Sequence, residues 1–118
     1  MSKKISKTIN YKFLSLNETI NKSRTNVYMA NNCKKKEMEL VSYYIRNIEP
    51  ITEYPVKITF NWHIKNKARD LDNCIPKNII DALVASKILI NDSVKYINEI
   101  THKYIEDKED FVEFVIEY

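Results

Sequence analysis

The sequence predicts an α+β domain, with one mixed β-sheet, helices packed on one face and the element order β-α-β-α-β-β. Residues 56–62 alternate apolar and polar side chains as a half-buried strand does. Two segments space their apolar residues as helices do, and two further strand-like segments close the chain. The 118 residues fit a single domain, 1–118.

The first half of the chain is expected to form one strand and one helix. Residues 8–15 alternate in the manner of a strand, and residues 16–30 are rich in Asn, Ser and Thr, which predicts a long functional loop. Asn31 and Asn32 are candidate N-caps of a helix that ends before Pro50. Its predicted apolar stripe consists of Met38, Val41, Ile45 and Ile48.

The second half predicts a central strand, a helix and two final strands. After the strand at 56–62, a helix is expected with Pro76 in its first turn and Asp72 as its N-cap. Strands follow at about 95–105 and 111–118, joined by an acidic turn. The chain contains no glycine, so turns that need a positive φ are expected to use Asn or Asp.

Charge is distributed unevenly along the chain. Residues 1–36 contain nine Lys or Arg and a single acid, Glu18, whereas the remainder has a net charge of −5. This asymmetry indicates a face that meets polyanions, although a solvated basic tail explains it equally well. Lys34, Lys35 and Lys36 are expected in the first turn of the first helix, where a bound phosphate would offset the helix dipole.

Other classes of protein are disfavoured. No apolar run is long enough for a membrane span, and the N-terminus lacks the apolar core of a signal peptide. Cys33 and Cys74 are isolated and are expected to be reduced thiols in a cytoplasmic protein. A zinc site made by both cysteines with His63 and His102 is a remote alternative, because these residues are scattered in the sequence.

The sequence Asp70-Leu71-Asp72-Asn73 suggests metal chemistry. Two carboxylates two residues apart on extended backbone point the same way, and a hard divalent cation relieves their repulsion. Lys77 is expected to lean back toward them, and the loop that contains Asp92 to approach the same end. Three carboxylates and a lysine suit Mg²⁺-dependent phosphodiester hydrolysis. Lys65, Lys67 and Arg69 would hold the DNA backbone.

Each residue also has a structural explanation. Asp72 can cap a helix, Asp92 can belong to a turn, and Lys77 with Asp81 is an ordinary i,i+4 pair. Asp81 is expected to be structural. Asn73 either orients a ligand carboxylate or continues the start of the helix.

Taken together, these residues resemble the RusA family of Holliday-junction resolvases. The similarity is concentrated in residues 69–92 and includes Asp70-Leu71-Asp72-Asn73, Lys77, Asp81-Ala82-Leu83 and Asp92. It extends over residues 9–118 through Ser15-Leu16-Asn17, Arg24, Asn26, the Lys34–Lys36 helix and Lys95-Tyr96.

The resemblance implies a homodimeric, Mg²⁺-dependent endonuclease that nicks four-way DNA junctions symmetrically, with Mn²⁺ as a substitute metal and no organic cofactor. By resemblance, Asp70, Asp72 and Asp92 bind the metal and Lys77 is essential. Three departures concern the Asn73–Lys77 spacing, which is one residue longer, Leu14-Ser15 in place of prolines, and Asn91 at a position that is often acidic.

We therefore expect a junction-resolving nuclease of recombination and repair in the cytoplasm of a bacterial or phage-infected cell. Its expected DNA-binding residues are Arg24, Lys34, Lys35, Lys36, Lys65, Lys67 and Arg69. A flap or branched-DNA nuclease and a non-catalytic junction-binding module remain alternatives. A small interaction protein without nucleic acid would show no salt-dependent DNA affinity.

Overall fold

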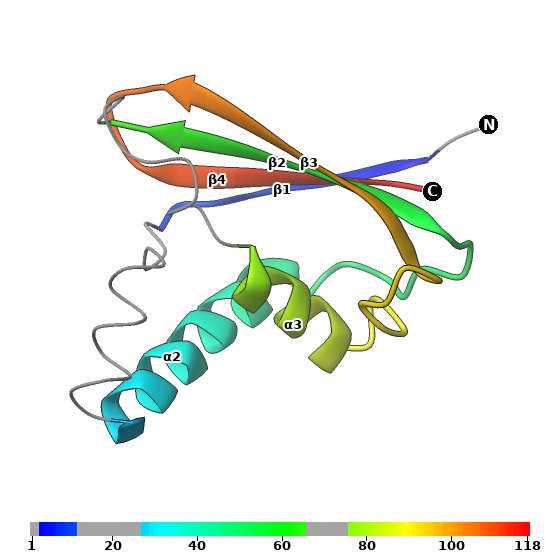
Figure 1. Cartoon of the computed structure of the whole chain (residues 1–118), viewed down its shortest axis with the longest axis horizontal. Coiled ribbons are helices and arrows are strands. Elements are labelled where there is room, and N and C mark those ends of the chain that lie inside the picture. The colour runs from blue at the N-terminus through cyan, green and yellow to red at the C-terminus, as the bar shows by residue number, and fades with distance from the viewer. Residues whose placement is uncertain (1–2, 12–26, 66–75) are drawn as a thin grey trace.

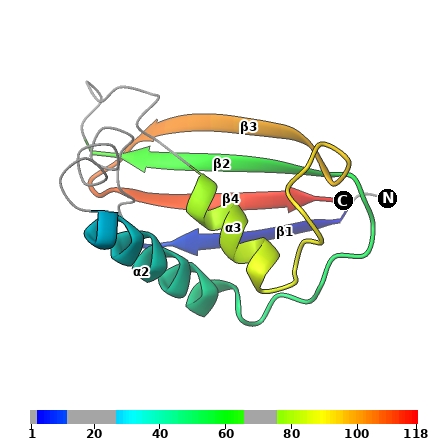
Figure 2. The same cartoon turned by 60° about the horizontal axis from the view of Figure 1, so that its bottom comes forward.

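Six elements follow one another along the chain in the computed structural model, which describes residues 3–11, 27–65 and 76–118 (Figure 1). They are β1 (Lys4–Ile9), α2 (Val27–Ile45), β2 (Val56–Ile64), α3 (Lys77–Ala85), β3 (Ile97–Glu106) and β4 (Phe111–Glu117). The four strands form one mixed sheet, and both helices lie on the same face of it (Figure 2). The predicted α+β class is therefore confirmed.

The strand β2 occupies a central position in this sheet. The strand order is β1-β4-β2-β3, and β2 is antiparallel to β4 but parallel to β3. A parallel neighbour requires a crossover connection, which here includes α3. The segment between β2 and α3 therefore starts at the carboxyl end of β2, and the segment between α3 and β3 returns to its amino end.

The alternation in β2 separates the two faces of the sheet. Its buried side chains are Val56, Ile58, Phe60, Trp62 and Ile64. They join residues of both helices and of β1 and β4 in one hydrophobic cluster. The side chains between them, such as Lys57 and Asn61, lie on the open face that no described helix covers. One face of the sheet thus supplies the core.

The end of α3 contains a left-handed residue without glycine. Lys87 has φ 62°, and its backbone N–H donates to the Val84 carbonyl at 3.0 Å. The Ile88 N–H donates to the Leu83 carbonyl at 3.0 Å, which completes a Schellman motif. Both Ile88 and Leu83 are buried, as the hydrophobic residues that accompany this motif commonly are. A non-glycine residue costs roughly 1–2 kcal/mol in the left-handed conformation. The expectation that only Asn or Asp takes a positive φ was wrong.

The first strand and the first helix begin earlier than expected. The strand β1 starts at Lys4 because six residues pair with β4, from Lys4 opposite Glu117 to Ile9 opposite Val112. The helix α2 starts at Val27, so Asn31 and Asn32 are not N-caps and residues 27–30 are not loop. Met and Ala in this stretch are good helix formers, and they outweigh the Asn pair.

The helix α3 begins later than expected. Its N-cap is Pro76, not Asp72, and Lys77 is its first residue. A proline disfavours helical backbone in the residue before it, which prevents the helix from extending further back. The Pro76 carbonyl accepts a hydrogen bond from the Ile80 N–H at 3.0 Å. Likewise Lys34, Lys35 and Lys36 lie beyond the first turn of α2, so they do not face its N-terminal dipole.

No helix in the described ranges is long and apolar enough to cross a membrane.

We predict that Phe114→Ala destabilises the fold by about 3–5 kcal/mol, because it removes a fully buried ring from an interior strand. Urea unfolding measures this loss as a lower midpoint. Val115→Ala, on the open face of the same strand, is the matched control and should cost far less. Equal losses would contradict a core on one face only.

Candidate functional site

The carboxyl end of β2 is the place where most of the predicted site begins. In open sheets, ligands bind outside the carboxyl ends of parallel strands, and here the segment that leaves β2 after Lys65 re-enters the described chain at Pro76. Five predicted site residues lie in that segment, outside the described residues: Lys67, Arg69, Asp70, Asp72 and Asn73. Arg24 lies outside them as well.

Lys77 belongs to a small charged cluster between the two helices. Its Nζ lies 3.6 Å from Asp81 Oδ2, and Lys34 Nζ from α2 lies 3.4 Å from the same oxygen. The Lys77 side chain is 69% exposed, whereas that of Asp81 is only 22% exposed. Asp81 thus links α2 to α3 and holds two cations side by side. The structural role expected of Asp81 stays a prediction.

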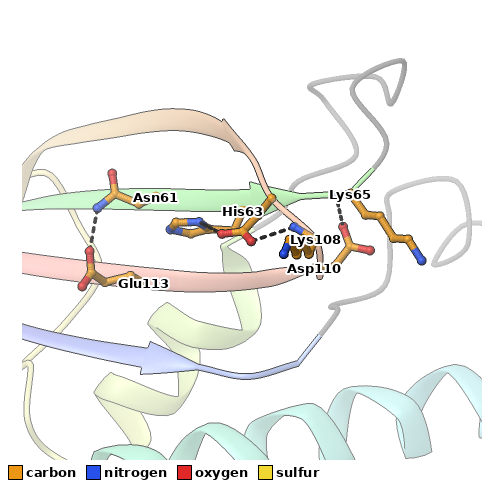
Figure 3. Close-up of polar contacts among 7 residues, drawn as sticks. Asn61, His63, Lys65, Lys108, Asp110 and Glu113 are labelled. Carbon is orange, nitrogen blue, oxygen red and sulfur yellow. Dashed lines mark hydrogen bonds and ion pairs between the residues drawn. The ribbon is translucent and has the colours of Figure 1, made fainter.

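The other described basic residues of the prediction are exposed. Lys35 and Lys36 project from α2, and Lys65 follows the last residue of β2. The Lys65 backbone N–H donates to Asp110 Oδ1 at 3.2 Å, while its side chain points away from that carboxylate (Figure 3). These ammonium groups are exposed to solvent and accessible to a polyanion.

Asp92 is placed at the opposite end of α3 from Lys77. It lies in the connection of residues 86–96, which meets the sheet where the Val56 N–H donates to the Tyr96 carbonyl at 2.8 Å (Figures 1 and 2). The α3–β3 connection must return to the amino end of a parallel strand pair. Asp70 and Asp72 lie outside the described residues, so the expectation that Asp92 joins them stays a prediction. Asp92 is exposed, and its N–H donates to Asn91 Oδ1 at 2.7 Å.

Glu37 is a buried carboxylate that the sequence interpretation missed. It is 3% exposed, and its Oε1 accepts a hydrogen bond from Asn78 Nδ2 at 2.6 Å. This contact fixes the start of α3 against α2, next to Lys77. The sequence did contain an indication of this burial, because residues 37, 41 and 45 are spaced to share one helix face. Val41 and Ile45 on that face are core residues.

The β3–β4 turn is bonded to the end of β2. His63 Nδ1 donates to Asp107 Oδ2 at 3.0 Å, and the Asp107 N–H donates to the Ile64 carbonyl at 2.9 Å. The Lys108 N–H donates to the second carboxylate oxygen at 2.6 Å. The hydrogen bond from Lys108, followed by the one from His63, lowers the pKa of Asp107. The His63 ring also stacks on Phe111, with centroids 4.1 Å apart.

These contacts give a rigid attachment for the segment that follows β2. Figure 3 shows the open face of the sheet here, where Asn61 Nδ2 also donates to Glu113 Oε1 at 3.0 Å. Polar bonds from two neighbouring strands thus fix the backbone up to Lys65. The residues after Lys65 begin from a defined position.

The two histidines face opposite sides of the sheet. His63 lies on the open face, whereas His102 pairs in register with Phe60 on the buried face. His102 Nδ1 accepts a hydrogen bond from Trp62 Nε1 at 2.9 Å, and burial lowers the pKa of His102. The buried Trp62 confirms its predicted place in the core. Because a sheet separates the histidines, the zinc alternative fails.

Among the described residues, no group of three or more His, Cys, Asp or Glu side chains is placed to hold a metal ion. Only Asp92 of the three predicted metal ligands lies within these ranges. A comparison with models of protein families found no match, and neither did a comparison with curated proteins.

We predict that Glu37→Ala costs about 1–3 kcal/mol of stability, because the Asn78 amide loses its buried acceptor. Chemical denaturation measures the difference. Glu39→Ala is the matched control, since Glu39 is exposed on the same helix, and it should change stability by less than about 0.5 kcal/mol. Equal effects would refute the structural role of Glu37.

We predict that Asp107→Asn makes the melting temperature less dependent on acid pH. A lowered pKa means that ionised Asp107 stabilises the fold above its ordinary value of 3.8, and that this contribution disappears as the pH falls below it. The melting temperatures of the parent and the variant should therefore converge as the pH falls from about 4 through the lowered pKa of Asp107. A constant gap across that range would contradict the assignment.

Proposed function

We propose that this protein is a Mg²⁺-dependent, structure-selective endodeoxyribonuclease that resolves four-way DNA junctions by paired symmetric nicks during recombination and repair. The observation that supports this most is the β2–α3–β3 unit. In the chain, residues 66–75, which include Asp70 and Asp72, follow the carboxyl end of β2 and precede Pro76 and Lys77 at the start of α3. Ligand sites recur at this position in open sheets.

The proposed metal site consists of Asp70, Asp72 and Asp92. Carboxylate oxygens are the ligands that Mg²⁺ prefers, and when bound the ion would stabilise charge on the scissile phosphate. Lys77 is the first residue of α3, whereas Asp92 follows the last residue of this helix by seven positions. Asp92 is therefore the member of the set that most needs a test of its own.

The role proposed for Lys77 is to neutralise charge that develops on the phosphate during cleavage. Its exposed ammonium group belongs to the first residue of α3, five residues after Asp72 in the chain. Asp81 holds it at 3.6 Å, and Lys34 adds a second cation to the same place. Two cations near one helix start favour the approach of a phosphodiester.

The proposed DNA contacts come from basic residues on several elements. Lys35 and Lys36 on α2 and Lys65 after β2 are exposed, and Arg24, Lys67 and Arg69 complete the proposed set. Contacts of this kind bind phosphates without reading sequence, which suits an enzyme that selects DNA shape. A homodimer would present two such sites about a twofold axis, which matches the symmetry of a junction.

The first experiment is cleavage of a labelled immobile four-way junction in Mg²⁺ and in EDTA, beside matched linear-duplex and flap substrates. We predict paired symmetric nicks on the junction in Mg²⁺ alone. We predict that Asp72→Asn lowers the cleavage rate at least about a hundredfold while junction binding is kept, because it removes a metal ligand but no phosphate contact.

Two further variants sharpen this experiment. Asp92→Asn should lose cleavage to a similar degree, and if it does not, Asp92 leaves the metal set while Asp70 and Asp72 stay in it. Glu53→Gln, an exposed carboxylate between α2 and β2, is the control and should cleave normally. Faster cleavage of flaps than of junctions would favour the flap nuclease. Binding without cleavage in Mg²⁺ and Mn²⁺ would leave a junction-binding module.

A further inference from the structure

The edge of the sheet at β3 differs from the edge at β1. In the described ranges β3 pairs only with β2, and it is ten residues long. Its exposed side chains include the apolar Ile100, at 44%. The other edge, β1, is only six residues long and contains Lys4 and Lys7. Short, lysine-bearing edges discourage strand pairing, whereas long edges with exposed apolar residues favour it.

The side chains near the middle of β3 have a symmetric charge pattern. Glu99, Thr101 and Lys103 pair in register with Lys57, Thr59 and Asn61 of β2, so they share the open face of the sheet. Glu99 and Lys103 are both exposed and lie about 13 Å apart along the strand, too far to pair with each other. Neither has an ion-pair partner in the described part of the chain.

We infer that β3 pairs antiparallel with β3 of a second copy of this chain, about a twofold axis at Thr101. In this register Thr101 lies opposite its symmetry mate, and each Glu99 lies opposite Lys103 of the second copy. Directly opposed charges of opposite sign stabilise an antiparallel pair, and this register forms the contact twice. On the other face, Ile100 lies opposite His102 of the second copy.

The position of the axis supports this register. Thr101 lies near the middle of the Ile97–Glu106 strand, so nearly the whole strand can pair. The two four-stranded sheets then join into one continuous sheet of eight strands, and the unpaired edge groups of both copies are satisfied. A register shifted by one residue would bring Glu99 opposite His102 or Tyr104 and lose both charge contacts.

This inference deepens the proposed homodimer by naming its surface. The test is the oligomeric state, which is measured without DNA or Mg²⁺. If no dimer forms through β3, this surface is excluded as the dimer interface. The cleavage experiment then still decides the nuclease assignment.

Charge reversal provides the decisive experiment, read by sedimentation velocity over a range of protein concentrations. Glu99→Lys and Lys103→Glu each place like charges opposite one another twice, so each should raise the dimer dissociation constant about tenfold or more. The double variant Glu99→Lys with Lys103→Glu restores opposite charges and should return the constant to the parent value. Glu109→Lys in the exposed β3–β4 turn is the control and should have no effect.

Disulfide cross-linking provides a second test of this interface. In a background of Cys33→Ser and Cys74→Ser, Thr101→Cys should give a disulfide-linked dimer under mild oxidation, because opposed Cα atoms of antiparallel strands lie within disulfide range. Ser6→Cys on the exposed edge at β1 is the matched control and should give little. The inference is overturned if the parent protein is a monomer, if the charge reversals leave its dimerisation unchanged, or if both positions cross-link equally.

Discussion

The position of β2 between β4 and β3 constrains most of the rest of the structure. Its alternating side chains divide the sheet into a core face and an open face. Its parallel pairing with β3 requires the crossover through α3, and this crossover decides which segments reach which end of the sheet. The described chain stops after Lys65 at the carboxyl end of β2, whereas the connection with Asp92 returns to the amino end of β3.

Hydrogen bonds fix the carboxyl end of β2 and the start of α3. The bonds among His63, Asp107 and the backbone attach the β3–β4 turn to β2, and the Glu37–Asn78 bond fixes α3 on α2. Asp81, with Lys34 and Lys77, adds a second link between the helices. Both boundaries of the segment with Asp70 and Asp72 are thus held by specific, directional contacts. A proposed catalytic segment benefits from such fixed ends, because a small misplacement of reacting groups is costly.

The two edges of the sheet suggest how the chain avoids uncontrolled association. Lysines at β1 discourage pairing there, and the charges of β3 suit pairing with its own copy in one register. In other registers these two charges lose their partners of opposite sign, which makes those registers less favourable. A single interface of this kind closes on itself, so it ends at a dimer and does not form a fibre.

The sequence by itself determined the α+β class, the core strand β2, the buried Trp62 and the uneven charge, because periodicity and composition are local properties. It did not determine where β1 and α3 begin, since strand pairing fixes the start of β1 and Pro76 is the N-cap of α3. Only the tertiary structure revealed Glu37 as buried, His63 and His102 on opposite faces, and Asp92 at the far end of α3 from Lys77. These relations depend on the direction in which distant strands pair, and residue spacing along the chain does not encode that direction.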